Sequence, residues 1–133
     1  MSSKDTNNPT EGQIQMAFVE YVRYKHPNLA ECLIHIPNEG KRSLREGAKQ
    51  KALGLTRGVS DLFFALPIWV PSLEKKYSGL WIEVKTKTGR ITKEQALFID
   101  RMNGCGYLAN VVRSLDGAID LFEQYIKGYY GHV

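Results

Sequence analysis

Hydrophobic residues recur along this chain at two spacings, one typical of helices and one typical of strands. Three segments, 10–26, 92–103 and 114–127, carry apolar residues three or four positions apart after a Ser or Thr that can cap a helix. A shorter helix is predicted over residues 43–53, before Gly54. The amphipathic stripe of the first helix consists of Ile14, Ala17, Phe18, Tyr21 and Val22, and the apolar set of the helix over 92–103 is Leu97, Phe98, Ile99 and Met102.

Four shorter segments have the length and composition of strands: 32–37, 60–66, 80–85 and 107–112. The segment 67–78, which contains two prolines and a Lys-Lys pair, indicates an irregular connection. Because no helix separates the second and third strands, we expect them to pair antiparallel. The order helix, strand, helix, strand, strand, helix, strand, helix predicts an α/β fold with a mixed sheet of about four strands flanked by helices.

Length and composition are those of a single globular domain. The 133 residues are 43% hydrophobic and 24% charged, enough for one sizeable core, which we place in residues 10–127. Residues 1–9 are expected to form a disordered N-terminal arm, and residues 128–133 a short tail. No apolar run suits a signal peptide or a membrane span. We therefore expect a cytoplasmic location and no membrane association. The two cysteines are far apart and support no zinc motif.

Basic residues are concentrated in two parts of the chain. The net charge is +4, and residues 41–57 contain six basic residues and one acid. Such groups form solvated faces in many proteins, but two of them near paired carboxylates favour a phosphate backbone as partner. The two groups are Lys41, Arg42, Arg45, Lys49, Lys51 and Arg57, and then Lys85, Lys87, Arg90 and Lys93.

The most informative stretch is the predicted strand over residues 80–85. Successive side chains of a strand point to opposite faces, so Glu83 and Lys85 project on the same side. Asp61, at the start of the preceding strand, would meet them if the two strands pair. Glu11 continues the apolar stripe of the first helix toward its start, where a carboxylate calls for an explanation.

Carboxylate oxygens without a histidine or cysteine partner suit a hard divalent cation such as Mg²⁺ or Mn²⁺. Such an ion polarises a phosphoryl oxygen and lowers the pKa of a bound water, and a nearby lysine can orient that water or stabilise developing charge. A Glu-x-Lys pair alone is a weak signal, because charged residues alternate on many half-exposed strands. The additional carboxylates and the two basic groups strengthen the prediction of a hydrolytic site.

The combination of Gly58-Val-Ser-Asp61, Glu83-Val-Lys85 and Gln95 resembles the PD-(D/E)xK nuclease superfamily. It is similar in particular to the small stand-alone VRR-NUC domains found in phages and bacteria. One position departs from the pattern: the family usually has proline before the aspartate, where this chain has Ser60. The similarity covers nearly the whole chain, through segments 10–15, 36–40, 54–66, 79–95 and 106–107.

The resemblance implies a restriction-endonuclease-like core and a role for each residue of the pattern. Asp61 and Glu83 would bind the metal together with the backbone carbonyl of Val84. Lys85 would act on the water nucleophile. Glu11 would complete the site, directly or through a water on the metal, and Gln95 would hold a water or a phosphate at the edge of the site. The proposed contacts to DNA phosphates are Lys41, Arg42, Arg57, Lys87 and Arg90.

The implied activity is hydrolysis of DNA phosphodiester bonds with Mg²⁺ or Mn²⁺, leaving a 5′-phosphate. Stand-alone members resemble Holliday-junction resolvases, so branched DNA such as four-way junctions, a homodimer, and the cytoplasm of a bacterium or phage-infected cell are expected. Two alternatives stay open: a DNA-binding or partner-binding module with a nuclease fold, and a nuclease for linear or single-stranded DNA. Gln95 could instead serve only to cap its helix with Thr92, and Glu11 only to complement a helix N-terminus.

Overall fold

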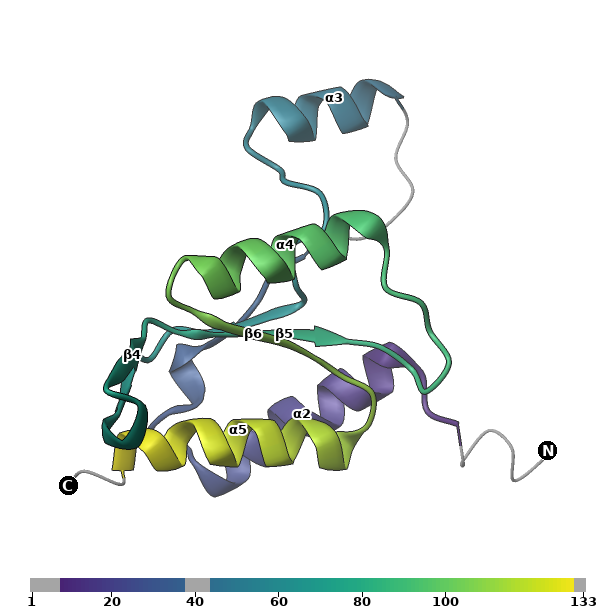
Figure 1. Ribbon diagram of the computed structural model, residues 1–133. Coiled ribbons are helices and arrows are strands. Elements are labelled where there is room, and N and C mark those ends of the chain that lie inside the picture. Colours follow the sequence, from purple (N-terminus) through teal and green to yellow (C-terminus); the bar gives the residue numbers. More distant parts are fainter. Residues whose placement is uncertain (1–7, 38–43, 131–133) are drawn as a thin grey trace.

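A four-stranded sheet lies between two layers of helices in the computed structural model, which describes residues 8–37 and 44–130 (Figure 1). The strands in spatial order are β1 (Leu33–His35), β2 (Leu62–Phe64), β5 (Leu80–Val84) and β6 (Leu108–Val112). β2 is antiparallel to both β1 and β5, whereas β5 and β6 run parallel. The predicted mixed sheet and the predicted antiparallel pairing of its two central strands are therefore confirmed.

Helices cover both faces of this sheet. α2 and α5 lie side by side on one face, α4 lies on the other, and α3 projects beyond α4 (Figure 1). None of the helices in the described segments is both long and apolar enough to cross a membrane. The bounds are α2 (Glu11–Lys25), α3 (Leu44–Ala52), α4 (Lys93–Gly104) and α5 (Leu115–Tyr130), with a 3₁₀ turn, η1 (Ala30–Cys32), before β1.

The helix starts follow the capping signals of the sequence. Thr10 and Thr92 each close a capping box, with Gln13 and Gln95 respectively. The Ser114 hydroxyl accepts the backbone N–H of Gly117 at the start of α5. α5 then continues three residues beyond the expected end of the domain at residue 127.

The hydrophobic core lies between the sheet and the α2–α5 layer. Phe18 of α2 and Phe64 of β2 pack edge to face against Phe122 of α5, with ring centroids 5.7 and 4.8 Å away. Alternate residues of β5 point into this layer and are buried, as the period of a strand requires. The stripe predicted for the first helix contributes Ile14, Phe18 and Val22 to this core, and all three are buried.

The opposite face of the sheet carries an aromatic layer under α4. Trp81 lies against Phe63 of β2 and Phe98 of α4, with ring centroids 4.3 and 5.0 Å away. Leu97, although it belongs to the apolar set of this helix, has an exposed side chain. A rotation of about 100° per residue turns Leu97 away from the sheet when Phe98 and Met102 face it.

The segment predicted as an irregular connection, 67–78, is a small hairpin instead. β3 (Ile68–Val70) pairs antiparallel with β4 (Lys75–Tyr77), and the 3₁₀ turn η2 (Pro71–Leu73) joins them. Glu74 completes the turn in the left-handed region at φ 48°. The hairpin packs on α5, where the Tyr125 hydroxyl donates to the Leu66 carbonyl at 2.7 Å.

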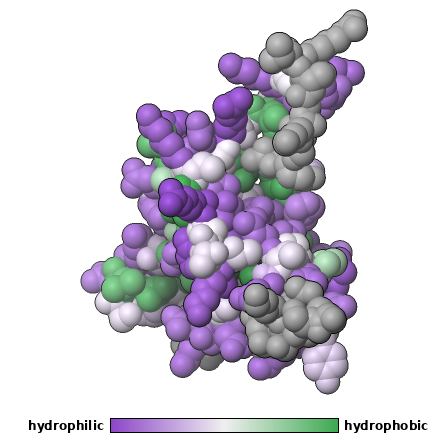
Figure 2. Space-filling view, turned by 90° about the vertical axis from the view of Figure 1, so that its right-hand side faces the viewer, coloured by the Kyte–Doolittle hydropathy of each residue, from purple (hydrophilic) through white to green (hydrophobic). Residues whose placement is uncertain are grey.

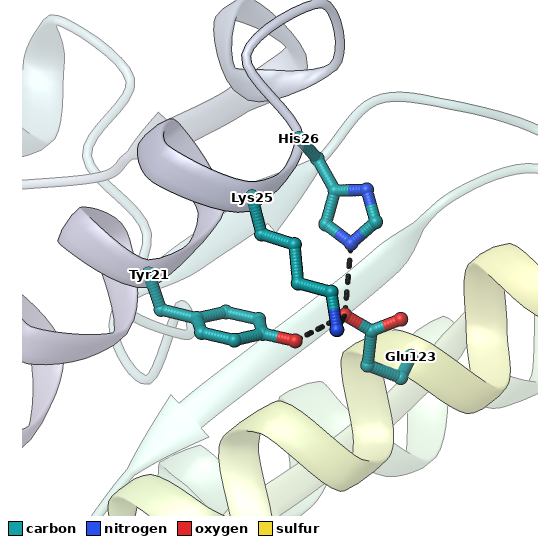
Figure 3. A network of polar contacts seen from close by, with 4 residues as sticks. All are labelled: Tyr21, Lys25, His26 and Glu123. Atoms are coloured by element: carbon teal, nitrogen blue, oxygen red, sulfur yellow. Dashed lines mark hydrogen bonds and ion pairs between the residues drawn. The ribbon is translucent and has the colours of Figure 1, made fainter.

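A polar network ties the C-terminal end of α2 to α5 (Figure 3). The Tyr21 hydroxyl donates to the Glu123 carboxylate, which also lies 2.8 Å from His26 Nε2 and 4.0 Å from Lys25 Nζ. Burial raises the pKa of Glu123, but hydrogen bonds from Tyr21 and His26 outweigh it and leave that pKa lowered. The network holds the helix whose other end carries Glu11.

Candidate active site

Strand register brings Asp61 and Glu83 together. β2 and β5 pair Leu62 with Ile82, so the residue before Leu62 lies opposite the residue after Ile82. The Asp61 side chain spans the pair, because its Oδ2 accepts the Val84 backbone N–H at 2.7 Å. This bond holds the Asp61 carboxylate across β5, beside Glu83.

Glu83 is a buried carboxyl group, and burial disfavours its ionised form. Its side chain is 2% exposed, and Oε1 has no hydrogen-bond partner within residues 8–37 and 44–130. Burial, then the Asp61 charge and a hydrogen bond with the Asp61 carboxyl, raise the pKa of Glu83 to about 8, although Lys85 acts in the opposite direction. Without a cation, Glu83 therefore holds a proton at neutral pH.

Lys85 follows β5 directly and is 8% exposed. Its backbone N–H donates to the Val112 carbonyl at 2.9 Å, which extends the β5–β6 pairing by one residue. Glu83 and Lys85 therefore keep the strand alternation that the sequence indicated. A buried ammonium beside a buried carboxylate stabilises the ionised form of that carboxylate.

Gln95 both caps its helix and contacts Glu83. Its Oε1 accepts the Thr92 backbone N–H at 2.9 Å, which completes the capping box. Its Nε2 donates to Glu83 Oε2 at 3.2 Å. The N-terminus of α4 is thus connected to the carboxylate through one side chain.

Glu11 approaches the site from the other helical layer. Its Oε2 lies about 3.6 Å from where a Cβ on Gly89 would stand, so it borders the loop between β5 and α4. Its charge raises the pKa of Glu83, though less than burial and Asp61 do. The starts of α2 and α4 and the end of β5 all lie at one end of the sheet (Figure 1).

The residues before Asp61 are packed tightly against α4. Gly58 has φ +82°, and a Cβ there would stand 2.3 Å from the Glu94 carbonyl oxygen. Ser60, the residue at the position of the family proline, is fully buried, and its hydroxyl has no hydrogen-bond partner among the residues that the structure describes. A short, crowded approach therefore fixes the start of β2.

The proposed phosphate contacts divide into two groups. Arg57, Lys87 and Arg90 are exposed, the last two in the loop between β5 and α4. Lys41 and Arg42 lie outside the described residues. Figure 2 looks onto the end of the molecule where this loop lies, and hydrophilic residues predominate on that face.

Two neighbours of the site had no clear signal in the sequence. His35 Nδ1 lies 3.0 Å from Gln15 Nε2 and 3.3 Å from the Asp61 carbonyl oxygen, so it stands between α2 and the start of β2. Arg113 follows β6 and donates to main-chain carbonyls of the loop after β5. Only the tertiary arrangement brings either residue to the site, because each is far in sequence from its partners.

The pair of carboxylates fits a hard divalent cation. Asp61 and Glu83 present carboxylate oxygens side by side as metal ligands. Glu83 Oε1 is buried and accepts no hydrogen bond from the described residues, so a bound cation would compensate it. Over residues 8–37 and 44–130, no three His, Cys, Asp or Glu side chains gather closely enough to hold a metal ion. Glu11 is therefore more distant than the pair, and a cation would rest on Asp61 and Glu83 with main-chain or water oxygens.

Comparison with known proteins agrees with this geometry. The family model of the VRR-NUC domain matches residues 7–116, a span that includes Glu11, Asp61, Glu83, Lys85 and Gln95. A solved structure described as "VRR_NUC domain protein" aligns with a TM-score of 0.76 and 26% identity, over 90% of each chain. Among curated proteins, none matches significantly. The chain belongs to the VRR-NUC family of nuclease domains.

Proposed function

We propose that this chain is an endonuclease that hydrolyses DNA phosphodiester bonds with Mg²⁺ or Mn²⁺ as cofactor. The observation that carries the proposal is the pair of adjacent carboxylates, Asp61 and the buried Glu83, with Lys85 on the same strand face. A module that only binds DNA gains nothing from such a pair, since carboxylates repel phosphates. A cation-binding hydrolase needs both acids.

In the proposed reaction, a water oxygen forms a bond to phosphorus and the P–O3′ bond breaks, which leaves a 5′-phosphate and a 3′-hydroxyl. A bound divalent ion would polarise the phosphoryl group and favour formation of the nucleophile. Asp61, Glu83 and the Val84 carbonyl would hold that ion. Lys85 would stabilise charge that develops on the phosphoryl oxygens or orient the attacking water.

Two further residues would support these groups. Gln95 would fix the orientation of Glu83, because its amide already donates to Oε2 and leaves Oε1 free for a cation. Glu11 would hold a water at the edge of the site, since it lies beside the loop after β5. Exposed Arg57, Lys87 and Arg90 would bind neighbouring phosphates.

A digestion panel tests both the activity and the substrate. The substrates are a four-way junction, a flap, a linear duplex and a single strand, each with Mn²⁺, Mg²⁺ or EDTA. We expect cutting that needs a divalent ion and falls by about two to three orders of magnitude in Asp61→Asn, Glu83→Gln and Lys85→Ala. Glu20→Gln, which changes an exposed carboxylate of α2, is the matched control and should cut normally.

The outcomes separate the candidate functions. Normal cutting by two of the three site variants, with circular dichroism showing them folded, would contradict the proposed mechanism. Preferred cutting of the junction supports a branched substrate, and preferred cutting of the duplex or single strand supports the alternative nucleases. A calorimetric Mn²⁺ titration that shows no dependence on Glu83 would favour a binding module.

We also propose that the active form is a homodimer, because two-fold symmetry suits paired cuts in a branched substrate. Sedimentation equilibrium at micromolar concentration measures the assembly directly. A monomer that retains full junction cutting would contradict this part of the proposal.

A further inference from the structure

The side chain of Arg113 binds the main chain of a loop beside the site. Its Nη1 donates to the carbonyl oxygens of Thr86 at 2.8 Å and Gly89 at 2.7 Å, and lies 3.4 Å from that of Lys87. These carbonyls belong to the connection between β5 and α4, at least 24 residues away in sequence. One side chain therefore gathers three main-chain carbonyls of this loop.

The loop is connected to the site at both ends and in the middle. It begins after Lys85 and ends at Thr92, whose capping partner Gln95 donates to Glu83. In the middle, Gly89 lies against the Glu11 carboxylate, and its N–H donates to the Thr86 carbonyl at 3.2 Å. A shift of this loop would therefore move groups on several sides of the site.

Arg113 itself is held close to Lys85. The preceding residue, Val112, ends β6 and accepts the Lys85 backbone N–H. Hydrogen bonds from a charged guanidinium are stronger than those between neutral groups, and the planar group can serve several acceptors in a fixed arrangement. Arg113 is thus anchored in the sheet at one end and bonded to the loop at the other.

The loop presents two exposed cations, Lys87 and Arg90. A loose loop would lose conformational entropy on ordering against a substrate, at about 1–2 kcal/mol per residue. We infer that Arg113 is a positioning residue for substrate binding, which fixes the loop 85–92 so that Lys87 and Arg90 meet DNA phosphates. This inference rests on the proposed nuclease function and adds a residue that holds its binding loop in place.

Hydrogen exchange of the free protein tests the first half of the inference. Arg113→Ala should speed exchange of loop amides within 86–91 by about tenfold or more, while amides of β5 and β6 stay protected. Arg23→Ala, which removes an exposed arginine at the far end of α2 from Glu11, should leave the loop unchanged. Unchanged loop exchange in Arg113→Ala would overturn the inference whatever the substrate.

DNA binding tests the second half, measured by fluorescence anisotropy with a labelled four-way junction in EDTA, where cutting is blocked. We expect Arg113→Ala to weaken binding about tenfold, Lys87→Ala about fivefold, and the double variant little more than Arg113→Ala alone. Arg113→Lys keeps the charge but ends about one bond short of the carbonyls, so it should bind nearly as weakly as Arg113→Ala.

The variants distinguish positioning from the other roles that Arg113 could have. Additive losses in the double variant would mean a direct contact of Arg113 with DNA, and wild-type binding by Arg113→Lys would mean that only its charge matters. Unchanged binding by Arg113→Ala, despite a loosened loop, would leave it a purely structural role. Each result overturns the inference. If the wild type binds and cuts no DNA, the proposed function is overturned, and with it the role of Arg113 in substrate binding. Hydrogen exchange would still decide whether Arg113 holds the loop.

Discussion

The raised pKa of Glu83 predicts an unusual pH dependence of stability in the metal-free protein. The folded state holds a proton on Glu83 up to about pH 8, whereas the unfolded chain releases it near 4.5. The folded state therefore binds more protons between these values, and stability falls as pH rises through that window. The slope is at most about 1.4 kcal/mol per pH unit, or on the order of 5 kcal/mol across the whole window.

Glu83→Gln removes this effect while keeping the shape of the side chain. The new amide can still accept from Gln95 and can donate to Asp61, so the buried site loses a charge and gains a hydrogen bond. We expect the variant to be more stable than the wild type at pH 8 in EDTA, by about 2 kcal/mol or more, and to differ less at pH 5.

Urea denaturation in EDTA at pH 5, 6, 7 and 8 measures both free energies of unfolding, with tryptophan fluorescence as the probe, since Trp81 lies in the aromatic layer on the Glu83 face. Adding Mn²⁺ at pH 8 should restore stability to the wild type and leave Glu83→Gln nearly unchanged. Glu20→Gln serves as the control and should follow the wild type. Parallel pH profiles for wild type and Glu83→Gln would refute the reasoning.

Three further predictions concern local packing and can be measured by the same urea denaturation at pH 7. Gly58→Ala should lower the free energy of unfolding by about 3 kcal/mol or more, because a Cβ there meets the backbone of α4. Gly54 also has positive φ but faces open space, so Gly54→Ala should lower it by about 1 kcal/mol. Equal losses in the two variants would contradict this difference. Ser60→Ala removes a buried hydroxyl without a partner, so stability should stay equal or rise by up to about 1 kcal/mol, and a loss of more than that would reveal a hidden partner. Tyr21→Phe should cost about 1 kcal/mol, and clearly less in a Glu123→Ala background; an equal cost in both backgrounds would show that the Tyr21–Glu123 bond contributes nothing.

Much of the fold could be predicted because its signals are local. A capping box and a 3.6-residue stripe lie within one helix, so Thr10 and the buried residues of α2 could be identified from sequence alone. Strand alternation likewise placed Glu83 and Lys85 on one face. The antiparallel pairing of β2 and β5 followed from the absence of a helix between them, and that pairing brought Asp61 to the site.

The errors arise where tertiary contacts decide the structure. β3 and β4 are three residues each, β3 lies between two prolines and β4 contains two lysines. They form a hairpin because α5 supplies a surface on which β3 packs. Leu97 belongs to a run of three apolar residues in which local spacing cannot say which one is exposed. Arg113 could not be predicted at all, since its partners are main-chain carbonyls, which carry no sequence signal.

The site gathers at one end of the sheet because of its topology. β5 and β6 are parallel, so the α4 crossover begins beside the carboxyl end of β5, and antiparallel β2 begins at that same end. The N-terminus of α4 carries partial positive charge and connects to Glu83 through Gln95, which favours the ionised carboxylate. Burial and the Asp61 charge nevertheless keep the pKa of Glu83 raised. The helix N-terminus and the Gln95 bond therefore do not offset the free-energy cost of ionising Glu83.

What the site lacks is positive charge. Among the described residues that affect the pKa of Glu83, the ionised forms of Glu11, Asp61 and Glu83 carry three negative charges against the one positive charge of Lys85. A monovalent cation would leave one negative charge uncompensated, whereas a divalent cation balances the remaining two. Na⁺ at equal ionic strength should therefore fail to replace Mn²⁺ in restoring the stability of the metal-free protein at pH 8. Equal recovery with Na⁺ would show that general screening, and not a bound divalent ion, compensates the buried carboxylates.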